Sequence, residues 1–168
     1  MGERWRTILA AVLARRDRWL PIALVAVGLF AVNGASRLIT WKGGIVKEDQ
    51  QMRIGFIAVA AVGVLLVAAS AWWSYRYPLG RMIADLGLAV LIACAASLII
   101  GPYLGGSRPF KGGLEFVVLQ ALLFLGLGAV GMFLGFIGVV AFGADWKSRG
   151  LKEYERSYRS RPHRPVRG

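Results

Sequence analysis

The fold class is decided by residues 114–142, LEFVVLQALLFLGLGAVGMFLGFIGVVAF, an apolar stretch with one charged side chain, Glu115. Three further apolar stretches cover residues 19–40, 54–74 and 79–100. About 20 apolar residues are enough for a helix to cross the roughly 30 Å of hydrocarbon in a bilayer. Each stretch must be helical there, because lipid offers the backbone no hydrogen-bonding partner. The sequence therefore predicts an all-α, multi-pass membrane protein with a bundle of four transmembrane helices.

The single cysteine and the single histidine limit the chemistry that these 168 residues can perform. Cys94 lies within the third stretch and has no second cysteine with which to form an internal disulfide or a redox pair. His163 lies in the C-terminal tail, so the usual histidine-containing metal and haem sites are not expected. We predict no metal, no cofactor and no enzymatic activity. Arginine outnumbers lysine by 16 to 5, a bias common in GC-rich bacterial genomes.

The basic residues predict which way the helices run through the membrane. With four spans, the N-terminal arm, the second connection and the C-terminal tail share one side, and they hold fifteen of the 21 Lys and Arg residues. Cytoplasmic segments of membrane proteins carry the excess of Lys and Arg. Both termini are therefore predicted to be cytoplasmic, against the anionic inner leaflet of the plasma membrane.

Terminal segments flank the predicted transmembrane domain, residues 19–143. Residues 1–18 form a basic arm with apolar residues at helical spacing, which predicts either an amphipathic helix on the membrane surface or an extension of the first span. A cleaved signal peptide is a competing interpretation of the first stretch. Residues 144–168 form a basic tail, predicted to contain a short interfacial helix followed by a disordered end. The chain shows no nucleic-acid-binding module.

Glycines recur through the fourth stretch. Gly126, Gly128 and Gly131 match the spacing of a dinucleotide-binding fingerprint, but that motif needs a preceding strand and a surrounding α/β fold. Close packing of another helix is the better interpretation. Four glycines at helical spacing form this predicted packing stripe: Gly128, Gly131, Gly135 and Gly138. The partner helix could belong to this chain or to another.

Ionisable and amide side chains at membrane depth are the candidate functional groups. Asp85 follows Arg81 by four residues, which predicts an ion pair on one helix face, although a proton- or substrate-coupling role for Asp85 is the alternative. At the outer end, Arg37 and Glu115 could pair across the first and fourth spans, or each could extend separately to the membrane interface. Asn33 and Gln120 would then lie beneath that pair.

Two outer loops share a pattern of Ser-Arg, an aromatic residue and Lys-Gly-Gly, at residues 36–44 and 107–113. A tandem duplication and a coincidence are both open explanations. Gly-rich backbone and arginine side chains suit phosphate or carboxylate groups. We therefore predict that this face binds an anionic headgroup or an acidic partner segment through four basic residues: Arg37, Lys42, Arg108 and Lys111. Ordinary interfacial anchoring is the competing interpretation.

These features favour a non-catalytic structural or accessory subunit of a larger membrane complex over an enzyme. The partners expected are membrane lipids and another membrane protein or a second copy of the chain. The alternative is a small-molecule or lipid transporter acting as a homo-oligomer. The chain resembles the small multidrug transporters in its number of spans, but its first stretch lacks the carboxylate that those transporters use.

Overall fold

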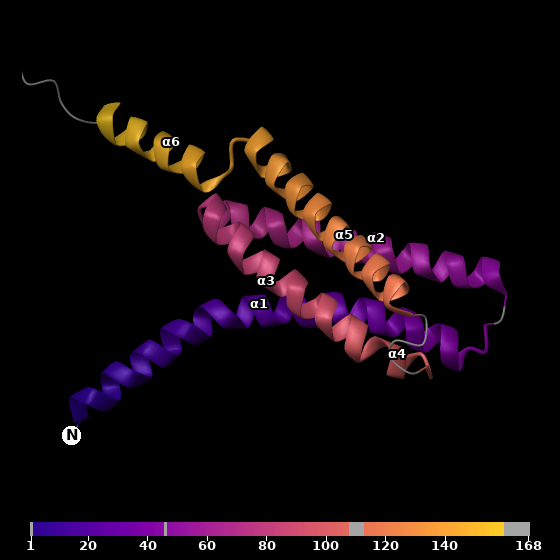
Figure 1. Ribbon diagram of the computed structural model, residues 1–168. Helices are drawn as coiled ribbons and strands as arrows, with labels where there is room; N and C mark the ends of the chain where they lie inside the picture. Colours follow the sequence, from indigo (N-terminus) through magenta and orange to yellow (C-terminus); the bar gives the residue numbers. More distant parts are fainter. Residues whose placement is uncertain (1, 46, 108–112, 160–168) are drawn as a thin grey trace, which may run out of the picture.

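The computed structural model describes residues 2–45, 47–107 and 113–159, with side chains between residues 18 and 158 of those ranges. All of its regular structure there is helical (Figure 1). The elements are α1 (Gly2–Lys42), α2 (Glu48–Arg76), α3 (Leu79–Ile99), α4 (Gly101–Leu104), α5 (Gly113–Ala141) and α6 (Trp146–Arg159).

Four regions are helical, long and apolar enough to cross a membrane: Arg18–Lys42 within α1, α2, α3, and Gly113–Tyr158, which contains α5. The predicted all-α class is confirmed, and the four long apolar helices indicate a multi-pass membrane protein. α2 begins six residues before the predicted stretch, because the charged residues at 48–53 continue the helix beyond its apolar part.

The N-terminal arm continues into the first span as one helix, since α1 runs without a break from Gly2 to Lys42. The helix extension, the other interpretation of this arm, describes the backbone. No glycine lies between residues 3 and 27 to end the helix, and Pro21 is accommodated inside it.

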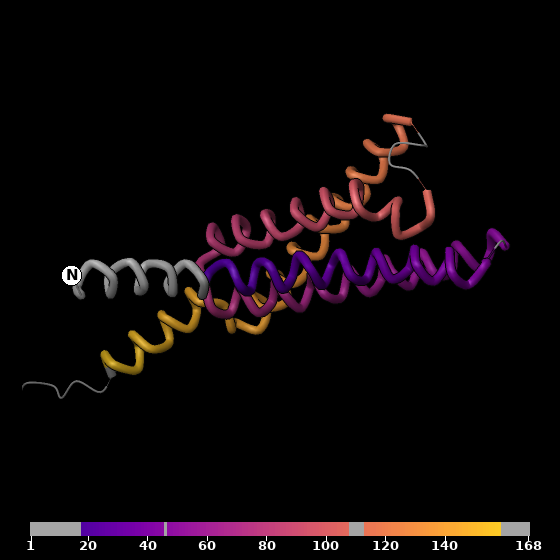
Figure 2. Tube along the Cα trace, turned by 90° about the horizontal axis from the view of Figure 1, so that it is seen from below, coloured from indigo at the N-terminus to yellow at the C-terminus, as the bar shows by residue number. Residues whose placement is uncertain are grey.

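The two ends of the bundle differ in their connections. One end carries the short turn between α2 and α3 and is called the hairpin end. The other carries the α1–α2 connection and α4, and is called the loop end. α1 packs on α2 and α3, while α5 lies obliquely across α2 and also contacts α3 (Figures 1 and 2). Figure 2 shows that the first turns of α5 lie away from α1, although the two overlap in the view of Figure 1.

The buried core lies mainly between α1, α2 and α3. Toward the hairpin end it contains Ile22, Ala26, Trp73, Met82, Leu86 and Ala89. Toward the loop end it contains Leu29, Val62, Leu66, Val90 and Ala93. Most other apolar side chains of the four long helices are exposed on the protein surface, which is where a bilayer would contact them.

The buried residues of α5 are three members of the glycine stripe, Gly128, Gly131 and Gly135. A Cβ atom at Gly131 would lie 2.6 Å from the Cβ of Leu66 on α2. The same atom at Gly128 would lie 2.8 Å from Val90 on α3. These glycines therefore pack α5 against helices of the same chain. Gly138 does not share this role, because nothing lies within 4 Å of its Cβ position.

Candidate functional site

A buried carboxylate lies near the hairpin end. The side chain of Asp85 is 2% exposed, and its Oδ1 accepts hydrogen bonds from Arg18 Nε at 3.1 Å and Nη2 at 2.9 Å. Its Oδ2 accepts from Arg81 Nε at 3.4 Å and from Trp73 Nε1 at 3.5 Å. The structure thus brings the predicted Arg81–Asp85 pair together. It adds two partners that sequence reasoning missed.

The contacts of Asp85 join three helices, because its partners come from α1, α2 and α3. A buried charge is tolerated when it is paired and hydrogen-bonded, and it destabilises the fold strongly when one partner is removed. Four donor atoms therefore converge on the carboxylate of Asp85. Arg18 immediately precedes the first apolar stretch, on the same predicted side of the membrane as Arg81 and Asp85, and this shared side is the signal that could have suggested the pair.

Aromatic rings at the hairpin end hold further arginines. The guanidinium of Arg81 lies 4.0 Å from the centroid of the Tyr77 ring, and that of Arg149 lies 4.0 Å from the Tyr75 ring. Arg149 also donates to the backbone oxygen of Tyr75 at 3.2 Å, which ties α6 to the end of α2. Such cation–π contacts suit a headgroup region, where the rings are partly apolar and the charges reach water.

At the loop end, Arg37 is half-buried and has no acidic partner among the described residues. Its Nε donates to Asn33 Oδ1 at 3.4 Å, a long hydrogen bond. Its guanidinium lies against Gly101, where an added Cβ would come within 3.3 Å of the Arg37 Cζ. Gly101 thus leaves room for this side chain.

The structure does not pair Arg37 with Glu115. Both residues are described, no ion pair joins them, and Glu115 is exposed. The physical reason is the oblique course of α5, which carries its first turns away from α1 (Figure 2). The neighbouring segment 108–112 contains no Asp or Glu, so its composition offers Arg37 no carboxylate either.

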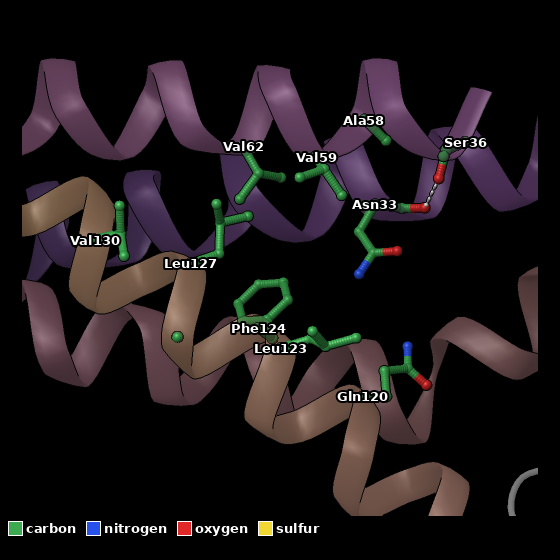
Figure 3. Close-up of a pocket in the computed structure, with 12 residues that line it drawn as sticks. Asn33, Ser36, Ala58, Val59, Val62, Gln120, Leu123, Phe124, Leu127 and Val130 are labelled. Carbon is green, nitrogen blue, oxygen red and sulfur yellow. Dashed lines mark hydrogen bonds between the residues drawn. The ribbon is translucent and has the colours of Figure 1, made fainter. Parts of the chain in front are cut away.

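Two cavities adjoin at this end, and both are lined by Ser36 and Gly55. The first, the polar cavity, has a volume of about 550 Å³. Its other lining residues are Arg37, Thr40, Trp41, Gly44, Ile45, Gln51, Ile54, Gly105 and Ser107. The second, the apolar cavity, has a volume of about 480 Å³ and lies between α1, α2 and α5 (Figure 3). Apart from Asn33, Ser36 and Gln120, its walls are apolar or glycine: Gly55, Ala58, Val59, Val62, Leu123, Phe124, Gly126, Leu127 and Val130.

Two amides face the apolar cavity. Asn33 of α1 and Gln120 of α5 point their amide groups into the space between the helices (Figure 3). Gln120 makes no hydrogen bond to any other described residue. An amide without a partner is costly in apolar surroundings. Asn33 and Gln120 thus line the same cavity, although no ion pair joins Arg37 to Glu115 above them.

The other predicted anion-binding residues contribute less. Lys42 is exposed in the last turn of α1 and lines neither cavity. Arg108 and Lys111 lie outside the described residues. Sequence reasoning missed Trp41, Gln51 and other polar-cavity residues, because the sequence does not show which loop residues face one another.

The two similar outer loops do not share a local structure in the part that can be compared. Ser36–Lys42 is helical, within α1, whereas Ser107 follows the turn after α4. The rest of the second pattern lies mostly outside the described residues. The structure therefore gives the duplication no support.

No protein-family model, no curated protein and no solved structure matches the chain.

Proposed function

We propose that this protein is a non-catalytic accessory component of a larger membrane assembly, and that its loop end engages an anionic group on the outer side of the plasma membrane. In this orientation the hairpin end and both termini face the cytoplasm, as the distribution of basic residues predicts. The observation that carries the proposal is Arg37, a half-buried guanidinium beside an open cavity with no carboxylate partner among the described residues.

A charged side chain near the hydrocarbon region is costly unless it is paired or reaches water. Arg37 is partly covered by α4 and by its own helix, and its described protein partner is one amide oxygen at 3.4 Å. A ligand or partner that supplied the missing anion would therefore gain a charge-assisted hydrogen bond. This explains why a basic residue is placed on the side that the charge bias leaves poor in positive charge.

The alternative, a transporter acting as a homo-oligomer, would need a carboxylate that can exchange a proton or an ion during transport. Asp85 is the buried carboxylate among the described residues, and two arginines and a tryptophan bind it. That arrangement favours a permanent structural charge. We therefore rank the accessory role above transport.

The proposal is tested by extracting the full-length, tagged protein into native nanodiscs and identifying what accompanies it. We expect a second membrane protein at fixed stoichiometry. A homo-oligomer that drives substrate uptake into vesicles under an ion gradient, with uptake lost in Asp85→Asn, would overturn the accessory role and support transport.

Orientation needs its own test. Gly44→Cys, in the α1–α2 connection, should react with a membrane-impermeant maleimide in intact cells in a Cys94→Ala background. Arg76→Cys, at the hairpin end, should react only after the membrane is opened. The reverse pattern would overturn the orientation.

A further inference from the structure

We infer that the two adjoining cavities at the loop end hold one anionic phospholipid, with its phosphate at Arg37 and one acyl chain between α1, α2 and α5. The inference deepens the proposed function, since it names the anionic group, and it rests on that proposal for the side of the membrane.

The proposed phosphate position follows from which hydrogen-bond donors in the polar cavity already have partners. Arg37 uses Nε for Asn33, and neither of its Nη nitrogens has a hydrogen-bond partner among the described residues. The hydroxyls of Ser36 and Thr40 already donate to backbone oxygens, at 2.7 and 2.9 Å. Gln51 likewise donates to the backbone oxygen of Ile45 at 2.7 Å. The free fork of Arg37 is therefore the donor group best suited to a phosphate.

The acyl chain position follows from the lining of the apolar cavity. Its walls are almost entirely apolar, and its volume of about 480 Å³ is within the range of small-molecule sites. A lipid chain gains little by leaving one apolar medium for another, because bilayer lipid is as apolar as leucine. The chain would fill a space that the oblique helix α5 leaves open, and the headgroup would supply the selectivity.

The two amides lie where the two halves of such a lipid meet. Asn33 contacts Arg37 on one side and lines the apolar cavity on the other. Gln120 faces the same space from α5 (Figure 3). Amide N–H groups can donate to the ester oxygens of a glycerolipid. A lipid in this position would thus satisfy the polar groups that the described protein leaves without partners.

Thickness favours a lipid chain over a partner helix as the occupant of the apolar cavity. A helix with side chains is about 10 Å across. The apolar cavity holds about 480 Å³. A single extended hydrocarbon chain is much thinner and needs no separation of the surrounding helices. A helix would have to push α5 further from α1.

Reconstitution of the full-length protein tests the inference. Purified protein is placed in nanodiscs of phosphatidylcholine that contain increasing fractions of phosphatidylglycerol, and lipid that stays bound after mild detergent extraction is counted by native mass spectrometry. We expect one retained phosphatidylglycerol per chain and much weaker retention of zwitterionic phosphatidylcholine. Equal retention of the two lipids by the unmodified protein would overturn the inference, without relying on any variant.

Variants locate the site. Arg37→Gln should reduce phosphatidylglycerol retention about tenfold or more, as expected for loss of a charge-assisted hydrogen bond. Ala58→Leu, which fills the apolar cavity, should reduce retention while leaving Arg37 intact. The matched control is Arg53→Gln, since Arg53 belongs to the same end but is exposed, pairs with Asp49 and lines neither cavity. A similar loss in Arg53→Gln would indicate a diffuse surface effect and overturn the assigned site.

The outcomes separate this inference from the proposed function. Retained phosphatidylglycerol without any protein partner would support the lipid site and reject the accessory role. A stoichiometric protein partner that binds equally well to Arg37→Gln, with no selective lipid, would reject the lipid site and keep the accessory role.

Discussion

Replacing Gly135 with alanine should weaken the packing of α5 on α2, whereas the same change at Gly138 should not. An alanine Cβ at position 135 would lie 2.5 Å from the backbone oxygen of Val67 and 2.6 Å from the Cβ of Ser70. At position 138 no heavy atom lies within 4 Å of that site. Both glycines belong to α5, so the pair of variants isolates the effect of the contact.

The magnitude follows from the size of the overlap. Non-bonded carbon atoms are most stable about 3.5–4.0 Å apart, so α2 and α5 would have to separate by about 1 Å. The obstacle is partly backbone, which cannot rotate away as a side chain can. Overpacking of this kind costs about 1–3 kcal/mol. Ser70 also donates a hydrogen bond to the backbone oxygen of Met132 at 2.6 Å across the same crossing. Loss of this hydrogen bond would add about 1 kcal/mol to the cost.

Alanine itself favours a helix over glycine by about 1 kcal/mol. We therefore expect Gly135→Ala to lower the free energy of unfolding by about 1–3 kcal/mol, and Gly138→Ala to raise it by up to about 1 kcal/mol. Tryptophan fluorescence can follow reversible unfolding as the detergent sodium dodecyl sulfate is added to mixed micelles. Equal shifts of the two variants in the same direction would refute the assigned crossing of α2 and α5.

Three further predictions use the same matched design. Asp85→Asn should lower the free energy of unfolding by about 2–3 kcal/mol, toward the lower limit for a broken buried pair, because the arginines that bind Asp85 are half-exposed. The control Asp49→Asn, which breaks an exposed ion pair, should lower it by less than about 0.5 kcal/mol. Equal losses in the two variants would contradict the buried position of Asp85. Asp145 Oδ2 accepts a hydrogen bond from a backbone N–H in the first turn of α6 and so caps this helix. Asp145→Ala should therefore speed amide hydrogen exchange in α6, and Asp145→Ser should restore protection. Unchanged exchange in Asp145→Ala would reject this capping role. Gly106 has φ +67° and an indole ring against the position of an added Cβ, whereas Gly44 has φ +58° and open space there. The melting temperature should therefore fall further in Gly106→Ala than in Gly44→Ala. Equal falls in the two variants would contradict the conformation of this turn.

The four long helices could be predicted because the relevant physics is local. Backbone groups in lipid need partners within the same segment, so an apolar stretch of sufficient length specifies a helix wherever it lies in the chain. The glycine stripe was also visible, because helical spacing alone puts its members on one face. The stripe did not reveal that Gly138 is left out, since that depends on where α5 departs from α2.

The polar sites were only partly predictable, for a related reason. Arg81 and Asp85 are neighbours on one helix, and their spacing brings them together. Arg18 comes from another helix, and its contact with Asp85 depends on how α1 packs against α3. The pair expected between Arg37 and Glu115 failed because the sequence gives no crossing angle for α5. The same angle opens the apolar cavity, so the sequence could not have located it.

The glycine contacts make the α2–α5 crossing the point about which α5 would rotate relative to α2. Leu114, at the loop end of α5, lies 17 residues from Gly131, or about 25 Å along a helix that rises 1.5 Å per residue. Each degree of rotation about the crossing would therefore move that end by roughly 0.4 Å. Small side-chain changes at Gly131 or Gly135 would thus be magnified into the width of a distant opening. The width of the loop end therefore depends on helix packing far from that end of α5.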